Sequence, residues 1–433
     1  MKVKSRFLSV AVLFLLFAQQ ARANHRFIVR IGAGLPGIQR ICTALACTVT
    51  RGLDGTLGQL FLVSVLDSAN PDTVLQLLQS QNGVSSVELD IPIKIPQIPD
   101  SNVIVPRGLY DWRPFNYFGA TVWNGYANQP AAQVIGLNVA RTSFNVLGSG
   151  IVGVIDTGID PSHPALQRVV VIGYDFTRDT RGIPAESSDL TQPVSPTATG
   201  TAVQVNDSTA AVLDQNSADI LTQYAAFGHG TMVSGVIHLV APNALIMPLK
   251  AFRADGTSTL SDILRAIYYG TQNGAKILNM SFSTPNYSKE LQRALQNAAA
   301  NGVISVGSAG NDGQEILVYP AALDDVMGVA STGYLDERSW FSNYGRVVWV
   351  AAPGEAIISP YPFGTYAASW GTSFSAPFVS GTAALLLDVR SDCNQTQAAG
   401  AISNARYLGP ELGYGRLDVY QAVGALIHSR GVP

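Results

Sequence analysis

The chain has 433 residues, of which only 13% are charged, with 27 Lys and Arg against 30 Asp and Glu. This near balance excludes a nucleic-acid-binding protein that works through a basic surface. The 47% of apolar residues exclude a disordered chain. Three cysteines are too few for a disulfide scaffold. The length predicts two or three domains, or one large α/β domain with a small one.

Residues 1–23 have the features of a cleaved export signal. A basic start precedes the apolar run 7–18, and Ala21-Arg22-Ala23 matches a small-residue cleavage site. The apolar run is shorter than the roughly 20 residues that a membrane-spanning helix needs. No later segment is long and apolar enough to cross a membrane. We therefore expect an exported, secreted or extracytoplasmic protein without a membrane span.

Residues 24–90 predict a small α+β domain. Its expected order, β-α-β-β-α-β, is the ferredoxin-like pattern. The expected elements are strand 26–30, helix 35–47, strands 48–51 and 59–65, a helix that begins after Asn70-Pro71, and strand 84–89. Cys42 and Cys47 both fall in the first helix. On a regular helix they point about 140° apart, so a disulfide between them requires a break in the helix.

Residues 91–130 contain closely spaced prolines, including Pro92, Pro96, Pro99 and Pro106. Proline at this density favours extended, exposed chain. We interpret this stretch as a linker and the start of the mature chain.

Residues 131–433 alternate short β-branched runs with helical stretches. This alternation predicts an α/β domain with a doubly wound, mostly parallel sheet that is covered on both faces. The expected strands are 151–155, 169–173, 244–249, 276–280, 302–306, 326–330 and 347–351, and helices are expected over 260–273 and 289–301. Residues 178–216 are rich in Thr, Ser, Pro, Ala and Gln, and we interpret them as a surface insertion.

Three polar residues stand at the ends of expected elements. Asp156 follows a buried strand, His229 begins an apolar helical run, and Ser373 begins another. Taken singly, each has a plain structural explanation as a turn, loop or helix-capping residue. Together they supply a hydroxyl nucleophile, the base that it needs and the carboxylate that orients the base. Their chain order is Asp, His, Ser, and not the order of α/β-hydrolases.

At this point the sequence resembles the subtilases, the family of subtilisin-like serine endopeptidases. The matching segments are Asp156-Thr157-Gly158-Ile159-Asp160, His229-Gly230-Thr231, Asn279-Met280-Ser281, Ala309-Gly310-Asn311, Gly371-Thr372-Ser373-Phe374-Ser375-Ala376-Pro377 and Gly413-Tyr414-Gly415-Arg416-Leu417-Asp418. The resemblance covers about residues 130–428. The N-terminal unit, 24–90, resembles the inhibitory propeptide of the family by its pattern of elements.

The resemblance implies a role for each matching residue. Asp156 would orient His229, which would take the proton of Ser373 as Ser373 attacks the scissile carbonyl. Asn311 matches the side-chain amide of the oxyanion hole. Substrate-binding positions are implied at Ser281, Phe282, Ser283, Gly307, Ser308 and Ala309.

The implied specificity pocket contains no charged residue. Val318 falls where relatives often have glycine, so the resemblance implies a narrow pocket that prefers small or medium apolar side chains. Asp312 and Glu315 are expected at an exposed rim. A rim carboxylate attracts Lys or Arg by at most about 1 kcal/mol.

The calcium site common in subtilases is expected to be missing. Relatives bind calcium through an Asp after the His-Pro of the first motif and through a loop after the catalytic His. Here His163-Pro164 is followed by Ala165, and residues 235–242 leave no room for that loop. A different calcium site stays open, and no other cofactor or metal is expected.

These observations predict an exported serine endopeptidase that is made as a self-processed precursor. Its expected partners are protein or peptide substrates and its own N-terminal domain, and we expect a monomer. Two alternatives stay open, namely a non-catalytic binding protein on the same fold and a carboxylester hydrolase.

Overall fold

The structure is a computed structural model that describes residues 24–66, 70–98, 103–190, 203–204, 210–213 and 215–429. The chain divides into two compact units. The first comprises residues up to Arg51 together with Phe61–Leu89, and the second comprises Gly52–Leu60 and Asp90–Pro433. The predicted export signal, residues 1–23, lies outside the described residues.

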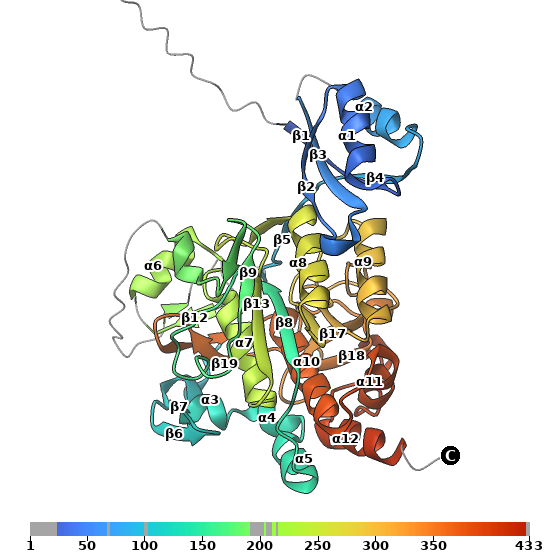
Figure 1. The fold of residues 1–433 in the computed structure, drawn as a ribbon. Helices are drawn as coiled ribbons and strands as arrows, with labels where there is room; N and C mark the ends of the chain where they lie inside the picture. The colour runs from blue at the N-terminus through green and yellow to red at the C-terminus, as the bar shows by residue number, and fades with distance from the viewer. Residues whose placement is uncertain are drawn as a thin grey trace, which may run out of the picture. The chain divides into compact units, whose positions relative to one another are not determined.

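The first unit is a four-stranded sheet with two helices. Its elements are β1 (Asn24–Ile31), α1 (Gly34–Leu45), β2 (Thr48–Gly52), β3 (Leu60–Leu66), α2 (Pro71–Gln79) and β4 (Val84–Leu89). The strand order is β2-β3-β1-β4, which is the ferredoxin-like arrangement (Figure 1). Asn70 caps α2 as its sequence predicts, because its side chain accepts hydrogen bonds from the N–H groups of Asp72 and Thr73.

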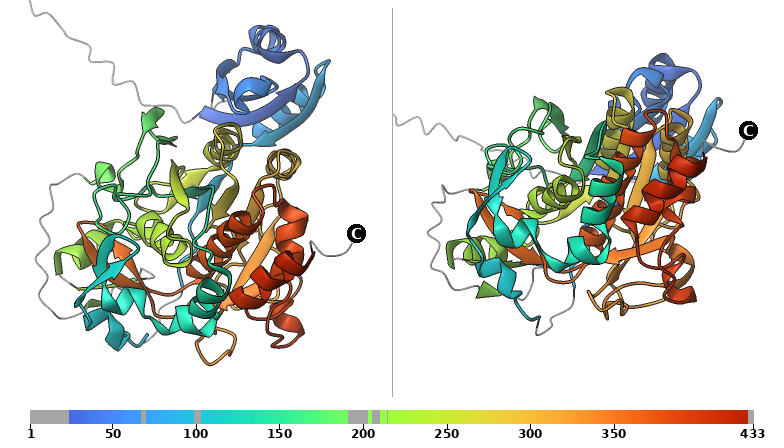
Figure 2. Two further views of the ribbon diagram at one scale, coloured as in Figure 1. Left: turned by 60° about the horizontal axis from the view of Figure 1, so that its bottom comes forward. Right: turned by 90° about the horizontal axis from the view of Figure 1, so that it is seen from below.

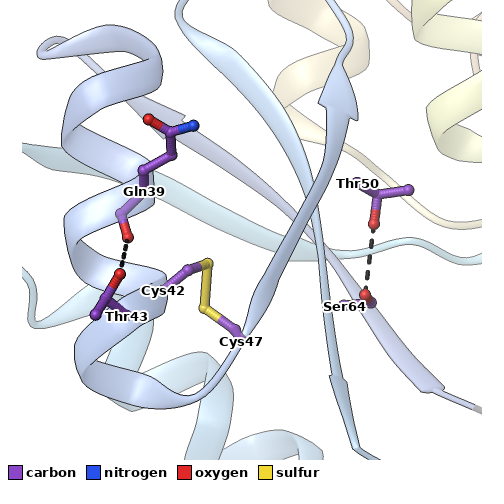
Figure 3. Close-up of a disulfide and its surroundings, with 6 residues drawn as sticks. All are labelled: Gln39, Cys42, Thr43, Cys47, Thr50 and Ser64. Atoms are coloured by element: carbon purple, nitrogen blue, oxygen red, sulfur yellow. Dashed lines mark hydrogen bonds between the residues drawn. A yellow bond between two sulfur atoms is a disulfide. The ribbon is translucent and has the colours of Figure 1, made fainter.

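Cys42 and Cys47 form a disulfide in this unit (Figure 3). The helix α1 ends at Leu45, and Ala46 takes the left-handed conformation with φ 53°. Cys47 therefore lies beyond the helix, which supplies the break that a bond between these two residues requires. The helix was expected to extend to residue 47.

The second unit is built on an eight-stranded sheet with the order β10-β9-β13-β8-β15-β16-β17-β18. Neighbouring strands in this sheet are parallel, except that β10 pairs antiparallel with β9. The strands are β8 (Ile151–Asp156), β9 (Gly173–Asp175), β10 (Thr180–Gly182), β13 (Leu245–Lys250), β15 (Ile277–Met280), β16 (Ile304–Ser308), β17 (Met327–Thr332) and β18 (Val350–Pro353). The predicted α/β fold is confirmed.

Helices pack on both faces of this sheet (Figure 2). Ile277 belongs to the core that contains α7 (His229–Val240) and α10 (Thr372–Val389). The next residue, Leu278, points to the other face, where it closely approaches Gly270 of α8 (Leu260–Gln272). On that face α8 packs beside α9 (Lys289–Ala300). Buried residues therefore occupy both sides of each central strand, as the continuous apolar runs predict.

The stretch 91–130 differs from the exposed linker that its prolines suggest. Its described part contains β5 (Pro92–Lys94), η2 (Arg107–Tyr110), the hairpin of β6 (Pro114–Tyr117) and β7 (Ala120–Trp123), and α3 (Asn124–Ala127). Ile93, Ile95 and Leu109 are buried. Apolar side chains between the prolines thus attach this stretch to the second unit.

The predicted surface insertion, 178–216, lies partly outside the described residues. Its described part includes β10, η3 (Glu186–Asp189), β11 (Val203–Gln204), β12 (Ala210–Val212) and the start of α6 (Gln215–Gln223). Glu186 is buried, so this part is not confined to the surface.

The remaining elements complete the second unit. They are η1 (Gly55–Leu57), α4 (Pro130–Val134), α5 (Leu137–Phe144), β14 (Thr257–Thr259), η4 (Gly345–Val347), β19 (Ile357–Tyr361), β20 (Thr365–Ser369), α11 (Gln395–Ile402), η5 (Pro410–Leu412) and α12 (Val419–His428). Among the described residues, no helix has the length and apolar character to span a membrane.

Candidate active site

Three elements bring the predicted triad residues to the edge of the sheet where the parallel strands end. Asp156 is the last residue of β8, His229 is the first residue of α7, and Ser373 lies in the first turn of α10. The helices α7 and α10 pack side by side (Figure 1). In open α/β sheets, ligand-binding and active sites usually lie at the carboxyl ends of the strands.

Asp156 and His229 form a buried hydrogen-bonded pair. Nδ1 of His229 lies 2.8 Å from Oδ1 and 3.0 Å from Oδ2 of Asp156. Their side chains are 1% and 4% exposed. This contact assigns the proton to Nδ1, so that Nε2 is left as the basic nitrogen of the neutral ring. Among the described residues, Nε2 has no hydrogen-bond partner.

Glycine at position 230 allows this close approach. A Cβ added there would lie 2.2 Å from the carbonyl oxygen of Gly158 and 3.2 Å from the Cβ of Asp156. The first turn of α7 could not approach β8 so closely with any larger residue.

Ser373 is buried, and its Oγ donates to the carbonyl of Ser281 at 3.1 Å. The next residue, Phe374, has its ring centroid 5.2 Å from that of His229. The first turn of α10 is therefore in contact with the imidazole. No hydrogen bond joins Ser373 to His229 in this conformation.

The side chain of Asn311 has a fixed orientation. Its Oδ1 accepts from the backbone N–H of Thr372 at 2.9 Å and from the Thr372 hydroxyl at 2.8 Å. Because a backbone N–H can only donate, this contact identifies which end of the amide is the oxygen. Nδ2 therefore points away from Thr372, and it donates to the carbonyl of Pro96 at 3.2 Å.

Residues 92–98 lie along this site like a bound peptide. The strand β5 pairs antiparallel with β14, and the N–H of Ile95 donates to Gly256. Ile93 and Ile95 are buried, whereas Lys94 between them is exposed. The segment thus combines backbone pairing with alternating side chains, which is how an extended peptide binds to a sheet edge. The sequence offered no signal for Gly256, β14 or Pro96 as site residues.

The predicted substrate-binding residues lie beside Ser373, but not all of them face open space. Phe282 is fully buried and packs against Phe252, with centroids 5.1 Å apart. The Ser308 hydroxyl donates to the carbonyl of Phe282 at 3.3 Å. Gly307 and Ala309 are buried, and Ser283 is partly exposed. Within the described part of the chain, no strand pairing involves Ser281, Phe282 or Ser283, whereas β5 pairs with β14.

The residues of the predicted pocket region differ in burial. Val318 is buried in an apolar cluster with Ala309 and Ala321. Asp312 and Glu315 are exposed.

A cavity of about 700 Å³ borders the loop that leads to Ser373. Trp370, three residues before Ser373, forms part of its wall, together with Trp340, Glu355 and residues 103–108. The N–H of Gly371 donates to the carbonyl of Gly354 at 2.9 Å, which ties this wall to the nucleophile loop. Across the described ranges, no group of three or more His, Cys, Asp or Glu side chains is placed to hold a metal ion.

The fold and this constellation define an α/β protein of the serine-hydrolase type, with a buried Asp–His pair beside a helix-borne serine. The subtilase family model matches residues 148–422, so the chain belongs to the subtilase family.

Several relatives support this assignment. The chain is 32% identical over 289 residues to a thermophilic serine proteinase of Bacillus sp. (strain AK1), covering 63% of this chain and 61% of that protein. It is 32% identical over 289 residues to thermitase of Thermoactinomyces vulgaris, covering 64% and 89%. Subtilisin DY of Bacillus licheniformis is 36% identical over 203 residues, covering 44% and 74%.

The fold also matches a solved structure over almost all of this chain. Fervidolysin from Fervidobacterium pennivorans, a keratinolytic enzyme related to subtilisin, has a TM-score of 0.70 at 23% identity. The match covers 93% of this chain and 61% of that chain. The chain thus spans about three fifths of the length of fervidolysin and of the Bacillus proteinase.

Proposed function

We propose that this protein is a serine endopeptidase that cleaves peptide bonds through Asp156, His229 and Ser373. The observation that carries the proposal is the buried hydrogen bond between His229 Nδ1 and Asp156, with Nε2 free beside the serine helix. Membership of the subtilase family and the orientation of Asn311 support it.

The chemistry follows from the geometry. Oγ of Ser373 attacks the carbonyl carbon of the scissile bond, and its proton passes to Nε2 of His229. Asp156 holds Nδ1–H and stabilises the imidazolium that forms. Nδ2 of Asn311 donates to the developing oxyanion. The C–N bond then breaks, the leaving amine takes the proton from Nε2, and water later hydrolyses the acyl-enzyme.

A fluorophosphonate probe and casein digestion test this proposal. We expect the purified protein to be labelled and to digest casein, and the Ser373→Ala variant to do neither. Ser375→Ala is the matched control, because its hydroxyl is also buried on α10 and has no hydrogen-bond partner in the part of the chain that the structure describes. Hydrolysis of a short-chain ester without casein digestion would favour a carboxylester hydrolase. No labelling of the folded wild-type protein would favour a binding protein.

The protein is made as a precursor and processed by its own serine. Support comes from residues 92–98, because the carbonyl of Pro96 receives the Nδ2–H of Asn311, where the oxyanion would form. This contact favours the Pro96–Gln97 bond as the bond that Ser373 cuts. The first unit, which ends at Leu89, would then be released as the inhibitory propeptide.

N-terminal sequencing of the mature protein tests the position of the cut. We expect Gln97 at the mature N-terminus, and we expect the Ser373→Ala variant to accumulate as the uncut precursor. The Ser375→Ala control should mature normally. A mature N-terminus elsewhere would reject the Pro96–Gln97 bond. Normal maturation of Ser373→Ala in a host without other proteases would reject self-processing.

The protein is exported, and residues 1–23 are its cleaved signal. The basic start, the apolar run 7–18 and Ala21-Arg22-Ala23 support this step. The precursor of Ser373→Ala should therefore begin at Asn24 when it is recovered outside the cytoplasm. Its substrates are proteins or peptides, and we expect it to act as a monomer.

A further inference from the structure

Glu186 lies behind the Asp156–His229 pair and has no role in the chemistry described above. Its side chain is fully buried, although it belongs to the predicted surface insertion. Its Oε1 accepts from the backbone N–H of Gly230 at 3.1 Å and from the hydroxyl of Thr157, and its Oε2 accepts from the hydroxyl of Thr231. All three donors belong to the two motifs that carry Asp156 and His229.

The Thr157 hydroxyl joins the two carboxyl groups. Besides its bond to Glu186, it lies 3.2 Å from Oδ1 of Asp156, and it accepts from the N–H of Gly230 at 2.9 Å. A hydroxyl has one proton, so it donates to one carboxyl group at a time. Glu186 and Asp156 therefore compete for the same hydrogen bond.

Protonation of Glu186 decides this competition. When Glu186 is ionised, the Thr157 hydroxyl donates to it, and Asp156 keeps the full negative charge that stabilises the imidazolium. When Glu186 is neutral, its own O–H donates to Oγ1 of Thr157, and the Thr157 proton turns to Oδ1 of Asp156. An added donor spreads the charge of Asp156 and weakens its hold on the imidazolium.

We propose that Glu186 is a positioning residue that controls, through the Thr157 hydroxyl, how strongly Asp156 stabilises protonated His229. The expected effect of Glu186 on the rate of peptide cleavage rests on the proposed function. Its expected effect on the protonation of His229 does not depend on that function.

The charged groups around Glu186 permit both protonation states near neutral pH. Burial raises the pKa of Glu186 to about 7, and the negative charge of Asp156 acts in the same direction, whereas the two hydroxyls and Lys250 lower it. Lys250 on β13 does not reach Glu186, because its Nζ donates to the Thr157 carbonyl at 2.6 Å and to Asp189 at 2.7 Å. Asp189, on the same short helix as Glu186, also pairs with Arg178.

The remaining acid nearby is also engaged. Asp160 donates its N–H to Oγ1 of Thr231, while its carboxylate accepts from Ser162 and from the N–H of Phe363. With His229 and Asp156 on α7 and β8, these are the titratable groups that face Glu186. Among the described residues, no cation forms an ion pair with Glu186, and its carboxylate accepts instead from two hydroxyls and one amide.

The decisive variant is Glu186→Gln, which imitates the neutral state at every pH. Its amide nitrogen can take the place of Oε1 and donate to Oγ1 of Thr157, and its amide oxygen can accept from Thr231. The N–H of Gly230 then keeps Oγ1 of Thr157 as its acceptor. We expect the pH at which His229 gains its second ring proton to fall by about half a unit to one unit. In active protein, the acid limb of kcat/KM should move by the same amount, and kcat at alkaline pH should fall about five-fold, with KM changed less than two-fold.

The protonation of His229 is measured by its downfield Nδ1–H proton NMR signal in full-length protein that carries Ser373→Ala. This readout needs no activity, so it separates failure of this inference from failure of the proposed function. Glu290→Gln is the matched control, because Glu290 is an equally buried glutamate on α9. It should leave the His229 titration unchanged.

Thr157→Val tests the route. Without the hydroxyl, Glu186→Gln should shift the His229 titration by less than a third of its effect in the parent. An equal shift with and without the hydroxyl would overturn the coupling through Thr157. An unchanged titration in Glu186→Gln, or a change in KM alone, would overturn the positioning role.

Wild-type protein provides a second measurement if Glu186→Gln does not fold. Glu186 and His229 then each gain a proton, and each proton affects the other group. The His229 NMR signal should therefore titrate over a wider pH range than that of a single group. Thr157→Val should narrow it to a simple one-proton curve. A one-proton curve in the wild type would reject the inference.

Discussion

The guanidinium of Arg141 occupies the carboxyl end of α7, and its removal should destabilise the second unit. Its Nη2 donates to the carbonyls of Leu239 and Val240, and its Nη1 donates to the Tyr117 hydroxyl at 2.8 Å. Arg141 is only 9% exposed. The last carbonyls of a helix carry partial negative charge, which a buried cation stabilises. We therefore propose that Arg141 takes the place of a metal ion at this helix end, and that no calcium binds there.

The magnitude follows from the bonds that Arg141→Met would remove. A hydrogen bond to a charged group contributes about 1.5–3 kcal/mol, and the effects of neighbouring bonds are not additive. The Leu239 carbonyl would keep the Tyr117 hydroxyl as a donor, whereas the Val240 carbonyl would lose the hydrogen bond from Arg141 Nη2. We expect a loss of about 4 kcal/mol. For a unit of roughly 350 residues, this lowers Tm by about 5 °C.

Calorimetry of full-length protein carrying Ser373→Ala, which prevents self-digestion, measures this loss. Arg168→Met is the control, since Arg168 is exposed and donates to one carbonyl, that of Gly119. It should lower Tm by less than 1 °C, because exposed contacts contribute little. A change below 1 °C in Arg141→Met would refute the argument. Full recovery of that variant on addition of Ca²⁺ would show that the helix end can bind a metal ion.

Three further outcomes are expected. Burial, with the positive charges of Arg141 and His163, lowers the pKa of His238 to about 4. Because histidine in the unfolded chain binds a proton near pH 6.5, the free energy of unfolding keeps its whole contribution from neutral His238 above that pH, and this contribution is lost as pH falls toward 4. Urea unfolding should show that His238→Phe removes about 2.5 kcal/mol of the loss between pH 7 and 4.5, and an equal loss in both proteins would contradict this. Asn311→Ala should lower kcat by about 10²–10³ with little change in KM, and steady-state kinetics that show a change in KM alone would reject its oxyanion role. Peptide-library profiling should show cleavage after small or medium apolar residues, since Val318 is buried in an apolar cluster with Ala309 and Ala321, and a dominant preference for Lys or Arg would overturn the pocket argument.

The alternation of runs along the sequence was sufficient to predict the α/β fold, but not every strand. The expected strand 169–173 is interrupted in the structure. Ile246 exchanges backbone hydrogen bonds with Val169 and Val171, and the ladder resumes only in β9. Pro248 stands in β13 between these points, and it has no N–H with which to continue the pairing. The sequence shows that a proline stands at position 248, but it does not show that β13 pairs with the segment 169–175.

The triad residues could be found in the sequence because each stands in a distinctive local segment. Glu186, Arg141 and Pro96 have no such signal. They act through partners 44, 98 or 99, and 215 residues away, respectively. Glu186 even lies in a stretch whose composition indicates surface. A residue that functions through hydrogen bonds to distant parts of the chain leaves no periodicity in the sequence, so only the folded arrangement reveals its role.

Pro377 shows how a residue that sequence reasoning treats as an obstacle contributes to the site. Proline is readily tolerated only in the first turn of a helix, but α10 begins at Thr372, and Pro377 lies inside the helix. Its missing N–H leaves the carbonyl of Ser373, four residues earlier, without a helical donor. The Ser281 hydroxyl donates to that carbonyl at 2.8 Å, and Asn279 Nδ2 donates to the same hydroxyl at 2.9 Å. The break in the helix ladder therefore joins the nucleophile's own peptide to the residue that follows β15, and it fixes Ser373 relative to the sheet edge on which the substrate would lie.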